Sequence, residues 1–163
     1  MADKSLDVYL NDHLAGAMFG SDLAEQLAQR TSDAPFGEAM RALATEIEAD
    51  RDTLKQLMDQ LGTSRNPAKQ ATTWIAEKLS RVKFSGAGGG DEFGMFQALE
   101  TLSLGVEGKA ALWTALGDVG DRYPPLAAVD FDALHERARD QRRIIEDQRS
   151  AAARRAFTGP DAG

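Results

Sequence analysis

The sequence contains no cysteine, only two histidines and no long apolar run. Without cysteine, the chain cannot have a disulfide framework, a thiol nucleophile or a Cys-ligated zinc or iron–sulfur site. No apolar stretch comes near the length of about 20 residues that a membrane span requires. The first ten residues also lack the apolar core of a secretory signal. We therefore expect a cytoplasmic protein that makes no membrane contact.

The chain has 163 residues, of which 42% are hydrophobic and 28% are charged. This length is typical of one domain with a buried core, and the composition is too apolar for a disordered protein. We expect a single domain over residues 1–163, with an ordered core at about 5–157 and a flexible tail at 158–163. The formal net charge of -7, from 26 acidic and 19 basic residues, argues against nucleic acid as a partner.

The basic residues are concentrated near the end of the chain. Residues 137–155 hold seven arginines against three acids, so this stretch is positive and the remainder is strongly acidic. One interpretation is a basic last helix that packs against an acidic body. The other is a patch for phosphates or for an acidic partner. The candidate patch residues are Arg137, Arg139, Arg142, Arg143 and Arg149.

Apolar residues recur at intervals of three and four in several long stretches, as on the buried face of a helix. No stretch alternates with a period of two for long enough to indicate a strand. The spacing predicts long helices at about 5–30, 35–62, 92–119 and 130–157. It also predicts a shorter helix at about 67–84, followed by a glycine-rich loop at 85–90.

The lengths of these helices indicate how they are connected. The four long helices are each about 38 Å long, and the short helix with its loop can span a bundle from one end to the other. The remaining connections are short, which is typical of antiparallel neighbours. We therefore expect an all-α, ferritin-like four-helix bundle with up-down-down-up order and a crossover helix between the second and third long helices.

Polar residues interrupt the apolar stripes of all four long helices. With a rise of about 1.5 Å per residue, they fall near one level of the bundle. They are His13, Asp50, Lys109 and Gln141. Our hypothesis is that Lys109 pairs with Asp50 in the interior and that His13 is a hydrogen-bonding neighbour, because a buried charge needs a partner. The alternative is that Asp50 and Lys109 lie at the edge of the stripe and reach solvent.

A di-iron site in such a bundle needs several carboxylates and, usually, Glu-x-x-His on two helices. The sequence contains no Glu-x-x-His, and a lysine at the same level would repel a metal ion. The nearest match, Asp132 to His135, falls in a first turn, where an acid more often serves the helix terminus. An iron or manganese site remains the alternative, with Glu46, Asp50, Glu100, His13 and His135 as its candidate ligands.

Three blocks of sequence carry a family resemblance. They are Tyr9-Leu-Asn-Asp-His-Leu-Ala-Gly16, Glu46-Ile-Glu-Ala-Asp-Arg51, and Leu99-Glu-Thr-Leu-Ser-Leu-Gly-Val-Glu-Gly-Lys109 continuing through Leu112-Trp113. Over about residues 9–156 the chain resembles a group of mainly actinobacterial proteins. The resemblance implies a ferritin-like bundle and brings no established activity, cofactor or catalytic residue. The iron-ligand pattern of ferritins is absent, so iron oxidation or storage is not implied.

Together these observations favour a non-catalytic binding or interaction module over an enzyme. We expect a homodimer or another homo-oligomer, because the last helix has a polar stripe that packs poorly on apolar faces. The first alternative is a carboxylate-bridged metal-binding protein or di-metal oxidase. The second is a bundle that binds a small ligand in a pocket near the glycine-rich loop.

Overall fold

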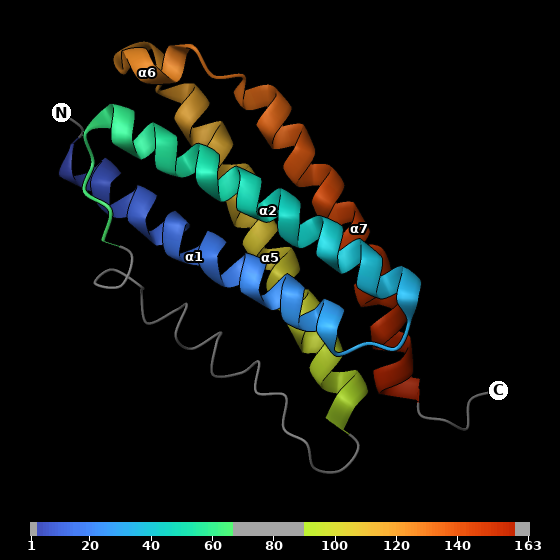
Figure 1. The fold of residues 1–163 in the computed structure, drawn as a ribbon. Helices are drawn as coiled ribbons and strands as arrows, with labels where there is room; N and C mark the ends of the chain where they lie inside the picture. Colours follow the sequence, from blue (N-terminus) through green and yellow to red (C-terminus); the bar gives the residue numbers. More distant parts are fainter. Residues whose placement is uncertain (1–2, 67–89, 159–163) are drawn as a thin grey trace.

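The structure, a computed structural model, describes residues 3–66 and 90–158 (Figure 1). Every regular element within these residues is a helix, so the predicted all-α class is confirmed. The long helices are α1 (Lys4–Gln29), α2 (Ala34–Leu61), α5 (Gly90–Asp118) and α7 (Phe131–Thr158). The helix expected at 67–84, the glycine-rich segment before Gly90 and the tail beyond Thr158 lie outside the described residues.

Local sequence explains where the long helices begin and end. Asp33 caps the start of α2, with Pro35 in the first turn, where its missing N–H has no intrahelical role. Gly62 ends α2 with a φ of 68°, a left-handed conformation that glycine adopts without steric cost. Asp130 Oδ1 accepts a hydrogen bond of 2.9 Å from a backbone N–H in the first turn of α7. These three boundaries match the sequence prediction.

The connection between α5 and α7 holds more helix than expected. Instead of reaching Val119, α5 ends at Asp118 and is followed by the 3-10 helix η1 (Gly120–Arg122) and the short helix α6 (Pro124–Ala127). The two prolines at 124–125 stop one helix and start another, because a fixed φ and a missing N–H both suit a first helical turn. Leu126 of α6 is buried, so this short helix closes one end of the core.

The four long helices form two antiparallel pairs, α1 with α2 and α5 with α7 (Figure 1). Within the bundle α5 runs in the same direction as α2, and α1 also packs on α5. The connection between α5 and α7, with η1 and α6, lies at the end of the bundle where α2 finishes (Figure 1).

The core follows the predicted stripes. The interior is mostly leucine and alanine, with Trp113 as its largest side chain. Buried stripe residues of α2 and α5 are Met40, Leu43, Ile47, Leu54, Leu57, Leu61, Leu99, Leu102, Val106, Trp113 and Leu116. The polar residues that interrupt these stripes, Asp50 on α2 and Lys109 on α5, belong to the candidate site.

Candidate functional site

Three charged or polar side chains lie in the core at the middle of the bundle. Asp50 of α2 is 1% exposed, Lys109 of α5 is 9% exposed and Gln141 of α7 is fully buried. Each occupies a position at which the three-and-four spacing directs the side chain inward, whatever its chemistry. Because an unpaired charge in the interior is very costly, these groups have to satisfy one another.

A hydrogen-bond network joins the three residues. Lys109 Nζ donates to Asp50 Oδ2 at 2.5 Å and also donates to Gln141 Oε1. The amide nitrogen of Gln141 donates to Asp50 Oδ2 at 3.2 Å and to Glu46 Oε2 at 3.0 Å. The structure therefore brings Asp50, Lys109 and Gln141 together from three helices and adds Glu46, which is one turn before Asp50.

A second cation completes the site. The guanidinium of Arg137 donates to Asp50 Oδ1, so each oxygen of this carboxylate faces a positive group. We expected Arg137 in the basic patch, whereas it reaches inward because it lies one turn before Gln141 on α7. We refer to Glu46, Asp50, Lys109, Arg137 and Gln141 as the core ion cluster. With two acids and two cations, its formal charge is zero.

Burial and pairing act on Lys109 in opposite directions. Burial lowers the pKa of the Lys109 ammonium because it penalises the charged form. The charge of Asp50 and the hydrogen bond to it oppose this decrease, but burial is the larger effect. Lys109 therefore depends on Asp50 to remain a buried cation.

His13 of α1 lies beside the core ion cluster but does not join its network. Within the described residues neither ring nitrogen makes a hydrogen bond, so the bond expected with the Asp50–Lys109 pair is not formed. The ring instead packs edge-on against Tyr9, with centroids 4.6 Å apart. Burial lowers the pKa of His13 from 6.5 to about 4, so the imidazole is neutral at physiological pH.

His13, Asp50 and Lys109 share one cavity. It has a volume of about 190 Å³, lies between α1, α2 and α5, and is lined mainly by aliphatic and aromatic groups. It lies at the level of the core ion cluster and reaches the surface at Leu104 and Gly105 of α5, which are both exposed. The glycine-rich loop, near which the sequence suggested a ligand pocket, lies outside the described residues except for Gly90.

The alternative metal ligands do not form one group. Glu100 is exposed, and His135 is half-buried near the start of α7 with Nδ1 3.9 Å from Glu136. Within residues 3–66 and 90–158 no three His, Asp or Glu side chains are placed so that they could hold a metal ion. Glu46 and Asp50 accept hydrogen bonds from the same amide nitrogen of Gln141, and there the nearby positive groups are Lys109 and Arg137.

The expected basic patch is neutralised by its neighbours. Apart from Arg137, its candidates each pair with an acid, three of them with acids of α7 itself and Arg142 with Glu107 of α5. The pairs are Arg139 with Glu136 at 3.1 Å, Arg142 with Glu107 at 3.0 Å, Arg143 with Asp140 at 2.8 Å and Arg149 with Glu146 at 2.7 Å.

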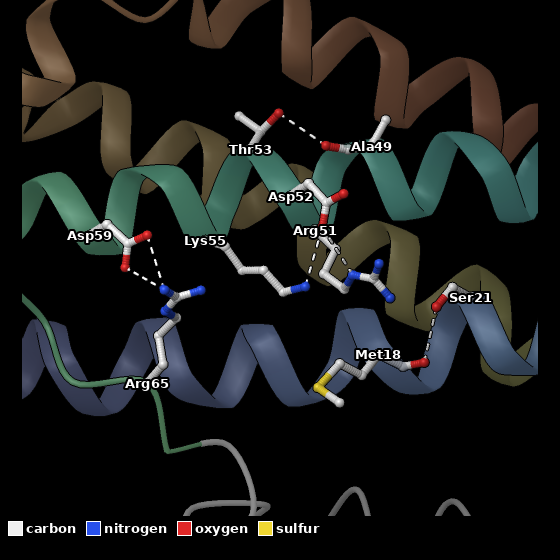
Figure 2. Close-up of polar contacts among 9 residues, drawn as sticks. All are labelled: Met18, Ser21, Ala49, Arg51, Asp52, Thr53, Lys55, Asp59 and Arg65. Carbon is white, nitrogen blue, oxygen red and sulfur yellow. Dashed lines mark hydrogen bonds and ion pairs between the residues drawn. The ribbon is translucent and has the colours of Figure 1, made fainter.

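Ordinary surface ion pairs provide a contrast to the core ion cluster. Figure 2 shows Lys55 reaching Asp52 on α2, with an Nζ to Oδ1 distance of 3.2 Å, and Arg65 reaching back to Asp59. Their side chains are between 33% and 57% exposed, so water screens these pairs. The pair formed by Lys109 has no such screening.

A buried polar residue that the sequence analysis missed is Asn11 of α1. Its amide donates to the carbonyl of Ser64 at 2.7 Å and accepts from the backbone N–H of Asn66 at 2.7 Å. Asn11 thereby holds the segment after α2 against α1. The feature of the sequence that could have indicated its burial is its position next to Leu10, a residue of the apolar stripe of α1.

Compared with protein-family models, curated proteins and solved structures, the chain has no match. In the part of the chain that the structure describes, no helix has an apolar stretch long enough to cross a bilayer.

Proposed function

We propose that this chain is a ferritin-like, non-catalytic binding module of the cytoplasm, in which the core ion cluster stands where other bundles of this kind hold two metal ions. The arrangement of two antiparallel helix pairs with α2 and α5 running in parallel supports the ferritin-like assignment, because this order needs a long connection. The three sequence blocks that resemble the actinobacterial group give independent support.

One observation carries the proposal, namely the ammonium of Lys109 at 2.5 Å from Asp50 Oδ2. A metal bound by this carboxylate would face that charge, and Arg137 on the other oxygen. Neither cation has a lone pair to offer a metal, and both repel a divalent ion. The residues present therefore do not fit a carboxylate-bridged pair of metal ions.

Elemental analysis tests this proposal. Protein purified without added metal should contain no stoichiometric iron or manganese, and titration with Fe²⁺ or Mn²⁺ should give no saturable binding. Lys109→Gln with Arg137→Gln is the matched comparison, because it removes both cations and retains Glu46 and Asp50. Stoichiometric metal in the unmodified protein that is lost in Asp50→Asn would overturn the proposal and support a metal-binding protein. Sedimentation of the same sample tests the self-association expected from the sequence.

A further inference from the structure

The cavity beside the core ion cluster has walls from three helices. Its volume is about 190 Å³, and α1, α2 and α5 each contribute part of its lining. Aliphatic groups such as Ile47, Leu54 and Leu112 form much of the surface, and Trp113 adds an aromatic ring. A cavity with such walls favours an apolar occupant.

Glycines in the helices keep this space open. Gly16 of α1 and Gly105 and Gly108 of α5 line the cavity, and a Cβ added at any of them would meet no atom within 4 Å. Glycine inside a helix is destabilising relative to alanine, and here no close contact of the backbone requires it. These three glycines therefore make their helices less stable than alanine would, at positions where any side chain would reduce the volume of the cavity.

Two polar groups of the lining have no hydrogen-bond partner among residues 3–66 and 90–158. Trp113 is 1% exposed, and its indole Nε1 has no acceptor within the described residues. His13 also lines the cavity, and its ring nitrogens are free of hydrogen bonds in the described part of the chain. A neutral imidazole has one donor and one acceptor nitrogen, and burial keeps this ring neutral by lowering its pKa to about 4.

The charged groups of the wall do not call for a charged ligand. Three charged residues line the cavity, namely Asp50, Arg51 and Lys109. Asp50 is bonded by Lys109 and Arg137, and the guanidinium of Arg51 pairs with Asp52 at 3.4 Å, so each lining charge already has a partner. An anion or a cation in the cavity would lose its hydration without gaining an unpaired countercharge. The wall therefore discriminates against ions and accepts neutral molecules.

We propose that this cavity binds a neutral, compact and mostly apolar small molecule that carries one hydrogen-bonding group, which His13 recognises. A single aromatic ring or a short branched chain has the right size, since an apolar cavity of about 150 Å³ accepts benzene. The inference rests on the binding role proposed above and names the class of ligand.

Calorimetric titration with phenol, toluene and benzoate tests the ligand class. Phenol should bind saturably, toluene should bind more weakly, and benzoate should not bind. His13→Phe keeps an aromatic ring and removes the hydrogen bond, so it should abolish the preference for phenol over toluene. Equal affinity of the unmodified protein for benzoate and phenol, or no binding of either neutral probe, would overturn the proposal.

Filling the cavity tests its location. Gly105→Leu and, independently, Gly16→Leu should weaken phenol binding at least roughly tenfold, which corresponds to about 1.4 kcal/mol. Ala111→Leu is the control, because Ala111 is exposed on α5 and the same side chain there adds nothing to the cavity. Circular dichroism of each variant confirms folding. Unchanged phenol affinity in both folded glycine variants would contradict the proposed site.

The metal analysis on the same samples separates the two proposals. A protein that is free of metal and binds neither neutral probe would overturn only the ligand proposal. A protein that binds iron or manganese through Asp50 would overturn the proposed function, whatever the result with phenol.

Discussion

Lys109 on α5 and Asp50 on α2 are 59 residues apart in the chain, and their charged atoms lie 2.5 Å apart in the core. Asp50 is almost fully buried, so its charge cannot be hydrated by solvent. The pair therefore ties α2 to α5 by an interaction that is costly to break from one side, since the remaining charge would stay buried.

We expect Lys109→Met to lower the free energy of unfolding by about 3 kcal/mol, measured by urea denaturation. This is the lower end of the about 3–5 kcal/mol that is typical of breaking a buried pair, because Arg137 and Gln141 still contact Asp50. Lys55→Met, which removes a surface pair with Asp52, should leave the stability nearly unchanged, because water screens this exposed pair. Equal losses in the two variants would place Lys109 in solvent.

Arg137→Ala should be milder, because the Arg137 side chain is 39% exposed. We expect a loss of about 1–2 kcal/mol from its charge-assisted hydrogen bond to Asp50. When Lys109→Met and Arg137→Ala are combined, Asp50 keeps only Gln141 as a partner from the core ion cluster. The double variant should therefore lose more stability than the sum of the single losses, and additive losses would show that the two cations act independently.

The long helices and their buried faces could be predicted because three-and-four spacing is a local property of the chain. The same spacing marked Asp50, Lys109 and Gln141 as core-facing, and helix rise placed them near one level. The resemblance and the periodicity alone did not distinguish a pair in the interior from one at the edge of the stripe. That distinction depends on how the helices rotate against one another.

The participation of Arg137 and the role of Asn11 could not be predicted from local patterns. Arg137 lies in an arginine-rich helix in which most of the other arginines pair with surface acids. It differs from them because it reaches the buried carboxylate of Asp50. Asn11 bonds to backbone atoms of residues 64 and 66, whose path after α2 is fixed by tertiary structure. Long side chains and loop backbones have a wide reach, and sequence spacing does not limit it.

Asn11→Ala should destabilise the protein by about 2 kcal/mol in urea denaturation, because it leaves the Ser64 carbonyl and the Asn66 N–H without their partner. Asn66→Ala is the control, since it keeps the backbone N–H that Asn11 accepts. If Asn11→Ala costs no more than this control, water replaces the lost hydrogen bonds and the segment after α2 is not held by Asn11.

The neutral state of His13 makes stability depend on pH. Burial lowers its pKa from 6.5 to about 4 in the folded protein, whereas the unfolded chain titrates near 6.5. Between these values the unfolded state binds more protons, so acidification favours unfolding. This contribution is absent well above pH 6.5, develops as the pH falls and is complete below pH 4, where it reaches up to about 3 kcal/mol.

His13→Gln removes the titrating ring and should therefore reduce the stability that is lost on acidification. Carboxylates also titrate in this range, so the quantity to compare is the difference in unfolding free energy between pH 7.5 and pH 5. We expect this difference to be smaller in His13→Gln by about 2 kcal/mol. His135→Gln is the matched control, because it makes the same substitution at a half-buried histidine that does not line the cavity. The same pH dependence in His13→Gln and in the unmodified protein would mean that His13 accepts a proton in the folded state as easily as in the unfolded chain.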